Sequence, residues 1–459
     1  MNLRRWLTPG IGIKRWLLVV FAGLLLLALA GAHVIRQVTR DVQPGPTTQV
    51  LIDFITLQFL PYPLRGLLVG LLGGTLAAYG SIRVIRAVVG PIWSSTADQP
   101  LVEVIYQKRF LARGPKVVAI GGGTGLSTLL RGLKEHTSNL TAVVTVADDG
   151  GSSGVLRTEL GIPPVGDIRN CIVALADAEP LMAELLQYRF PGVDAAGEPM
   201  PANSAVDDPS HGVRPDLPGL GGHAVGNLLI AAMAAIQDGD FEEGVRRMNR
   251  VLAVRGQVLP VSPTPMTLHA QLRDGSLVEG QSRIAQASDI ERVWLTPDDV
   301  AASDDALTAI GEADLIVLGP GSLYTSLLPS LLVPGIRDAV AASSALRAYV
   351  CNVATQHGET SGYDLANHFE ALVAHTAPGL VDVVLANNQF AARIPDGWHA
   401  EPVRLRWPPS GPPAPRLVLD DVVDPEDAHH HDPARLAASL LRVLEREGQR
   451  RRTGVARSA

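Results

Sequence analysis

The chain alternates short apolar segments with loops rich in glycine or acidic residues, and this alternation constrains the fold more than any other feature. Residues 116–120 read Lys-Val-Val-Ala-Ile, and residues 121–125 read Gly-Gly-Gly-Thr-Gly. Leucines then recur at helical spacing over residues 126–133. The order of apolar segment, glycine turn and helix is typical of a buried parallel strand that leads into a helix.

Further segments of this kind predict a whole sheet. Residues 141–146 are a second β-branched segment, followed by the loop Asp-Asp-Gly-Gly-Ser-Ser-Gly. In the second half of the chain, strands are expected at residues 313–318, 349–353 and 381–386, and residues 319–326 form another glycine loop before a helix. Strands that alternate with helices predict an α/β fold with a doubly wound, mostly parallel sheet, in which ligands bind beyond the carboxyl ends of the strands.

The first glycine loop has the composition of an anion site. Glycines let the backbone approach an anion closely, and the free N–H groups and dipole of a helix start attract it. The loop matches neither the dinucleotide pattern nor a Walker A loop, and a simple tight turn is the alternative. Three successive glycines exceed what such a turn needs, which favours anion binding. The ligand residues expected here are Gly121, Gly122, Gly123, Thr124 and Gly125.

Polar side chains gather at the same predicted edge. Asp148 and Asp149 suit a ribose hydroxyl pair or Mg²⁺, and the alternative is a capping role in a polar loop. Asp167 suits a helix N-cap or a contact to substrate or metal. His223 and Asn227 share one helical face. The remaining candidates from the residues alone are Gly151, Asn352 and Gln356.

The N-terminal region concentrates the apolar residues of a chain that is 46% hydrophobic and only 19% charged. Residues 16–35 carry no formal charge and are long enough to span a bilayer, and residues 66–82 form a shorter, glycine-rich stretch. A cleaved signal peptide ending near residues 28–30 is the rival interpretation of the first stretch. Either case places the rest of the chain in the cytoplasm, anchored to the cell membrane as a transmembrane helical hairpin if both spans are kept.

These features predict four regions. We expect a membrane anchor at residues 1–90, a linker at 91–115, an α/β domain at 116–440 with an insertion at 191–220, and a flexible tail at 441–459. A net charge of −7, without a basic segment interleaved with aromatics, argues against nucleic acid as a partner. The two cysteines have no metal-ligand spacing and are expected to be buried thiols.

Several segments resemble one known family. They read VVAIGGGTGLSTLLRGLK, TAVVTVADDGGSSGVLR, PPVGDIRNCIVALA, YRF, GHAVGNLLIAAM, LGPGSLYTSLLPSLL and CNVATQHGET. In this order they closely resemble the gluconeogenesis factor (YvcK-like) family, within the CofD-like superfamily of 2-phospho-lactate transferases. The resemblance implies a Rossmann-like fold. The ligand positions that it implies are Gly122 to Gly125, Asp148, Asp149, Ser152, Asn170, Asn227, Gly321, Ser322 and Thr325.

The chain departs from the family pattern at Val155, where a basic residue is common, and at His357, where proline is common. The resemblance implies a regulator that binds a nucleotide-sugar such as UDP-N-acetylglucosamine and serves cell shape and envelope synthesis during gluconeogenic growth. The alternative is an Mg²⁺-dependent transferase that moves a phospholactyl-type group from a nucleotide carrier. No base–nucleophile pair in the sequence demands catalysis, which favours a non-catalytic factor. A third interpretation is an envelope scaffold, and the further partners expected are a second copy of the chain and envelope-synthesis proteins.

Overall fold

The computed structural model describes residues 111–177, 180–193, 199–200, 220–390, 394, 399–409 and 414–457, with isolated residues before them. Contacts divide the chain into two units, residues 1–109 and 110–459. The named helices and strands lie in the second unit.

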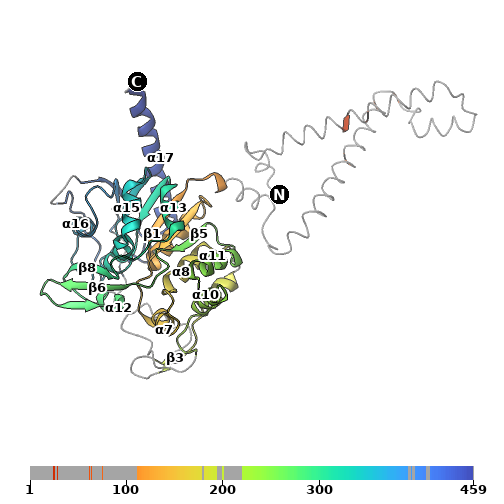
Figure 1. The fold of residues 1–459 in the computed structure, drawn as a ribbon. Helices are drawn as coiled ribbons and strands as arrows, with labels where there is room; N and C mark the ends of the chain where they lie inside the picture. The colour runs from red at the N-terminus through yellow and green to blue at the C-terminus, as the bar shows by residue number, and fades with distance from the viewer. Residues whose placement is uncertain are drawn as a thin grey trace, which may run out of the picture. The chain divides into compact units, whose positions relative to one another are not determined.

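A seven-stranded sheet forms the centre of this unit (Figure 1). Its strands are β1 (Val117–Gly121), β2 (Leu140–Val144), β5 (Gln257–Pro260), β9 (Leu315–Leu318), β10 (Leu346–Val350), β11 (Val383–Asn387) and β12 (Arg416–Asp420). Their order is β12-β11-β10-β9-β1-β2-β5, and every pairing is parallel. Strands β1, β2, β9 and β11 are fully buried, which explains their continuous apolar sequences.

Helices pack against one another in two groups. One group contains α6 (Gly123–Leu133), α8 (Gly166–Leu175), α9 (Pro180–Gln187), α10 (Val225–Ile236), α11 (Phe241–Val251) and α17 (Pro433–Arg457). The other contains α13 (Asp304–Gly311), α14 (Leu328–Leu332), α15 (Pro334–Ala342) and α16 (Leu365–His375). These groups, together with the parallel sheet, form the Rossmann-like α/β fold that the sequence predicted.

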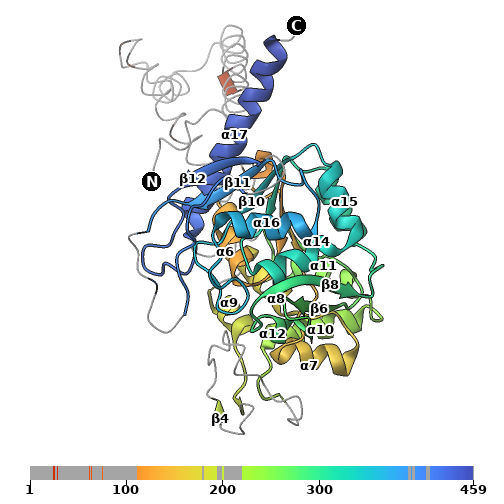
Figure 2. The same ribbon diagram turned by 90° about the vertical axis from the view of Figure 1, so that its left-hand side faces the viewer.

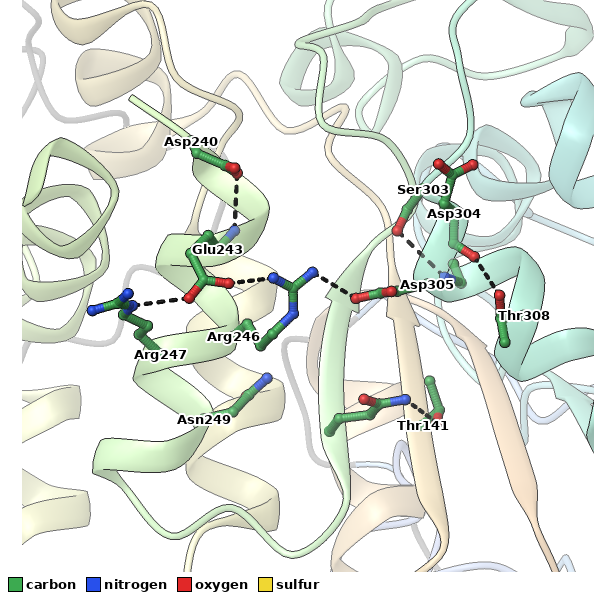
Figure 3. Close-up of polar contacts among 12 residues, drawn as sticks. Thr141, Asp240, Glu243, Arg246, Arg247, Asn249, Ser303, Asp304, Asp305 and Thr308 are labelled. Atoms are coloured by element: carbon green, nitrogen blue, oxygen red, sulfur yellow. Dashed lines mark hydrogen bonds and ion pairs between the residues drawn. The ribbon is translucent and has the colours of Figure 1, made fainter. Parts of the chain in front are cut away.

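Edge strand β5 is bracketed by α11 and α13. The Arg246 guanidinium donates to Glu243 on its own helix and, at 2.7 Å, to Asp305 on α13, so that the bridge runs across the strand (Figure 3). Asn249 donates to the Val258 carbonyl at 2.9 Å. A charged bridge over an edge strand opposes pairing with a foreign strand.

A small antiparallel sheet lies at the carboxyl end of the main sheet. It contains β6 (Thr267–Leu272), β7 (Leu277–Glu279) and β8 (Ile290–Thr296), and α12 (Gln281–Ile284) follows β7. Both views place it on the same side as α7 (Gly151–Leu160), away from α17 (Figures 1 and 2). It therefore borders the edge at which the sequence predicted a ligand site.

The strand expected at residues 349–353 is displaced by three residues. Strand β10 ends at Val350, because the chain turns at Asn352, whose side chain bonds the backbone of a neighbouring loop. Strands β5 and β12 and the small sheet were not predicted, since their segments mix apolar with polar residues instead of forming a continuous apolar segment. The terminal helix α17 continues to Arg457, because the segment expected as a tail is rich in leucine, glutamate and arginine.

The predicted membrane spans, residues 16–35 and 66–82, lie almost entirely outside the described residues. Among the residues that the structure does describe, no helix combines the length and apolarity that crossing a membrane requires. In the predicted insertion, β3 (Gly192–Val193) and β4 (Pro199–Met200) form a two-stranded ladder, and most of its other residues lie outside the described part.

Candidate functional site

The two glycine loops meet where the strand order reverses. Strand β1 lies between β2 and β9, so the loops after β1 and β9 leave the sheet side by side at its topological switch point. A Cβ atom on Gly125 would lie 2.8 Å from the Pro320 carbonyl oxygen and 2.9 Å from the Gly321 Cα. A Cβ atom on Gly321 would lie 3.1 Å from the Gly122 carbonyl oxygen. Glycine is therefore required at this contact because backbone packs on backbone.

The first loop presents an accessible helix start. Helix α6 begins at Gly123, its N-cap Gly122 provides no side-chain cap, and Thr124 in its first turn is exposed. Gly123 has φ +67°, a conformation that favours glycine. The first amides of a helix have no intrahelical partner, so this turn retains donors for an anion.

Two carboxylates flank the first loop. A Cβ atom on Gly122 would lie 2.3 Å from an Asp167 carboxylate oxygen, so this side chain fills the space beside the loop. Burial and, to a lesser extent, the nearby Asp148 charge raise the pKa of Asp167 to about 7 against the opposing effect of the Gly123 amide. Burial also raises the pKa of Asp148, although the Gly150 amide, which donates to it at 2.9 Å, opposes the shift.

Asp149 does not share this position. Its Oδ1 atom accepts from the amide and hydroxyl of Ser282 at 2.8 and 2.7 Å, which ties the loop after β2 to α12. In this structure Asp149 therefore has the capping role that the sequence analysis gave as the alternative to a ligand contact. Within the described ranges, no group of three or more His, Cys, Asp or Glu residues could hold a metal ion.

Three predicted residues form one buried hydrogen-bonded cluster. The Asn227 amide donates to Ser152 Oγ at 3.0 Å, and Ser152 Oγ lies 3.0 Å from His223 Nδ1. Burial lowers the pKa of His223, which favours the neutral ring. Asn227 Oδ1 is buried and, in the described chain, has no hydrogen-bond partner. Ser152 lies at the start of α7, which Gly151, with φ +48°, opens beside free space. Asn227 lies in the first turn of α10, but His223 precedes this helix, so the helical face predicted for the two residues is wrong and Ser152 joins them instead.

Asn170 lies on α8 close to Asp167 but makes a different contact. Its Oδ1 atom accepts from the Arg169 guanidinium at 2.9 Å. The aliphatic part of the Arg169 side chain covers Gly226 on α10. A Cβ atom on Gly226 would lie 2.8 Å from the Arg169 Cδ atom. Asn170 thus belongs to the contact between α8 and α10.

The second loop is held by side chains that follow β10. The Asn352 side chain accepts from the Gly321 amide at 3.2 Å and donates to the Gly321 carbonyl at 3.0 Å. The Gln356 amide donates to Ser322 Oγ at 2.6 Å. The structure therefore brings Gly321, Ser322, Asn352 and Gln356 together, as the shared edge predicted.

Sequence reasoning missed Glu359, which occupies the helix start of the second loop. Its Oε1 atom accepts from the amides of Tyr324 and Thr325 at 2.6 and 2.8 Å. The Glu359 side chain is buried, and burial raises its pKa to about 7 against the opposing effect of these amides. A carboxylate of the chain itself thus occupies this helix start, next to the positions Ser322 and Thr325 that the resemblance implied as ligand contacts. The Gly-Glu-Thr segment after a predicted strand was the available signal.

One cavity lies far from these loops. A space of about 320 Å³ is lined by Lys116, Asn139 and Gln257 among others, at the amino ends of β1, β2 and β5. Ligands of doubly wound sheets bind at the opposite edge, so the glycine loops remain the candidate site.

Comparisons with known proteins found one matching family model and several similar proteins. The family model "2-phospho-L-lactate transferase CofD" matches residues 117–401. A putative gluconeogenesis factor of Nostoc sp. is 42% identical over 95% of this chain and 92% of its own length. The gluconeogenesis factor of Bacillus subtilis is 47% identical over 62% of this chain and 82% of its own length.

A solved structure from Bacillus halodurans is 42% identical, covers 72% of this chain and 100% of its own, and superposes with a TM-score of 0.62. The matched family segment contains both glycine loops, both carboxylates beside the first loop, and Glu359. The chain therefore belongs to the gluconeogenesis factor (YvcK-like) family of the CofD superfamily.

Proposed function

We propose that this protein is a nucleotide-sugar-binding regulator, with UDP-N-acetylglucosamine as the representative ligand, that links gluconeogenic growth to morphogenesis and envelope synthesis. The observation that carries the proposal is the start of α6 at the switch point of the sheet, where Thr124 is exposed. This position suits a diphosphate, because the start of α6 combines backbone N–H donors with the positive end of the helix dipole. The gluconeogenesis factor relatives support the physiological setting.

Neighbouring residues supply the polar contacts that such a ligand needs. Ser152 lies at the start of the adjacent α7 and bonds His223 and Asn227 at the start of α10. Their hydroxyl, imidazole and amide groups suit sugar or ribose hydroxyls. The unpartnered Asn227 Oδ1 provides an acceptor for a ligand N–H or O–H group. Asp148, in the loop between β2 and α7, is the carboxylate that we propose for a ribose contact.

Titration calorimetry of UDP-N-acetylglucosamine against wild type and Thr124→Glu tests the proposal. The new carboxylate repels phosphate at the start of α6, so affinity should fall at least about tenfold, which corresponds to roughly 1.4 kcal/mol. An acidic residue in the first turn also favours the helix, so the loss of binding does not reflect unfolding. Thr308→Glu, an exposed position on α13 with the same charge change, should bind like wild type. Equal affinities in all three proteins would contradict the proposal.

A transferase is the second candidate, because Asp148 and Asp167 lie close enough beside the first loop to raise the pKa of Asp167. Two such carboxylates fit Mg²⁺, which would neutralise the phosphate charge of a nucleotide carrier. Incubation with a nucleotide-phospholactate donor, a deazaflavin acceptor and Mg²⁺ should then yield product that Asp167→Asn abolishes. If no product forms while nucleotide-sugar binding is saturable, the transferase is excluded and the regulator is the function that stands.

We further propose that residues 16–35 and 66–82 anchor the protein to the cell membrane, with the α/β domain in the cytoplasm. Their uncharged, leucine-rich sequences support this. The full chain should remain in the membrane fraction after carbonate extraction, and deletion of residues 1–90 should release it. Release of the full chain by carbonate would contradict the anchor.

A further inference from the structure

Arg157 on α7 is half-buried and, within the described part of the chain, forms no ion pair. Its Nη2 atom donates to Thr267 Oγ1 at 2.8 Å, and its Nη1 atom lies 3.5 Å from the main-chain carbonyl oxygen of Asp148. Both acceptors are neutral. The guanidinium is therefore held in a fixed position, but its positive charge is not neutralised by the chain.

Other half-buried arginines of this protein are paired with carboxylates. Arg255, whose side chain is 11% exposed, lies 2.6 Å from Asp177 Oδ1, and Arg347, which is 17% exposed, lies 2.6 Å from Asp382 Oδ1. Charged side chains are rarely withdrawn from water without such a partner, because the lost hydration must be replaced. A guanidinium that only neutral oxygen atoms hold in place is available to an anion from outside the chain.

The guanidinium of Arg157 lies at the edge of the sheet where the ligand is proposed. Helical side chains point back toward the N-terminus, which brings this group from the last turn of α7 to Asp148, before the helix begins. Asp148 lies close enough to Asp167 to raise its pKa, and Asp167 lies beside Gly122 in the first loop. A series of neighbouring groups thus connects Arg157 to the first loop.

The charges of the site leave a role for this cation. The start of α6 provides N–H groups and a helix dipole, whereas Asp148 and Asp167 place two carboxyl groups beside it, which repel phosphate when ionised. The guanidinium fork matches the geometry of phosphate oxygens. We propose that Arg157 pairs with a phosphate group of the bound nucleotide and that Thr267 positions it, an inference that rests on the proposed ligand site.

Titration calorimetry of the full chain with inorganic pyrophosphate and with UDP-N-acetylglucosamine tests the role of Arg157. Arg157→Met removes the charge and keeps an unbranched side chain, so the affinity for both probes should fall at least about tenfold. Arg157→Lys keeps the charge without the fork and should fall less. Arg250→Met is the matched control, because Arg250 also lies in the last turn of a helix, α11, and is exposed. It should bind like wild type.

Salt dependence separates a ligand contact from a purely structural bond between α7 and β6. If Arg157 pairs with phosphate, the pyrophosphate affinity of wild type should fall more steeply with added NaCl than that of Arg157→Met. Thr267→Val removes the bond that positions the guanidinium but leaves its charge, so it should weaken binding less than Arg157→Met. Variants of Arg157 and Thr267 that lower the melting temperature but leave pyrophosphate affinity unchanged would overturn the proposal.

The two probes also distinguish this proposal from the proposed function. Equal binding of UDP-N-acetylglucosamine by wild type and Arg157→Met would reject the role of Arg157 and leave the nucleotide-sugar ligand standing. Pyrophosphate binding that depends on Arg157, without binding of UDP-N-acetylglucosamine, would support the role of Arg157 and contradict the nucleotide-sugar ligand. A wild type that binds neither probe would overturn both.

Discussion

The two glycine loops look alike in sequence but differ in what occupies them. Each follows a buried strand, precedes a helix and lies at the switch point between β1 and β9. At the first loop, Asp167 accepts from the Gly123 amide while Thr124 in the same turn stays exposed. The second loop buries Thr325 and gives its amide to Glu359. A glycine loop before a helix therefore creates a potential anion site, and a distant residue decides whether that site stays open.

The difference also assigns the loops different tasks. At the first loop, Asp167 lies beside Gly122 and leaves the outer face of the turn accessible. At the second, Glu359, Asn352 and Gln356 together fix the backbone. The second loop is therefore fixed by side chains of the chain itself, and the first loop packs against it.

The largest expected effect comes from breaking the contact between the loops. Gly125→Ala places a methyl group less than 3 Å from the backbone of residues 320 and 321, so one loop must move. We expect a loss of about 2–3 kcal/mol in the free energy of unfolding, as for overpacked cores. Urea denaturation measures this. Gly311→Ala, which has open space around the new Cβ, is the control, and equal stability of the two variants would refute the close contact.

Removing the internal anion should have the next largest effect. Glu359→Ala leaves the Tyr324 and Thr325 amides buried without their acceptor, at a cost of about 1–3 kcal/mol. Added acetate or phosphate should restore part of the melting temperature by entering the vacated position. Glu359→Gln keeps an acceptor oxygen and should lose less. A Glu359→Ala protein that anions do not stabilise would argue that the second loop cannot bind an anion even when open.

The pH dependence of stability should be smaller. The pKa of Glu359 is raised to about 7 in the folded protein, so the folded state binds more protons than the unfolded state between the ordinary carboxyl range and pH 7. Stability should therefore rise as the pH is lowered through 7, with this group contributing on the order of 1 kcal/mol. Denaturation midpoints at pH 8 and 5.5 measure the change. Glu359→Gln should reduce it, and an identical pH profile in that variant would exclude Glu359 as its source.

The sequence was sufficient to predict the local units of the fold. Continuous apolar segments predicted β1, β2, β9 and β11, because parallel strands are buried on both faces. Strand β12 was missed because its residues are only partly buried, so its pattern resembles that of a loop. Strand β5 is short and begins with an exposed glutamine, which hides its apolar core.

The site was predictable in composition but not in pairing. The prediction of a shared polar edge correctly placed Ser152, His223 and Asn227 close together. Ser152 is 71 residues from His223 and 75 residues from Asn227 in the sequence. Asp149 and Asp148 are adjacent in sequence yet face different partners, because the chain bends at Gly150. Glu359 lies 34 residues from the amide it caps, so no local pattern specifies that contact.

A crystal structure of the protein with UDP-N-acetylglucosamine tests the difference between the loops most directly. The diphosphate should lie on the backbone amides at the start of α6, next to Thr124, with Glu359 still bonded to Tyr324 and Thr325. A diphosphate on the second loop with Glu359 displaced, or a ligand bound away from both loops, would contradict it.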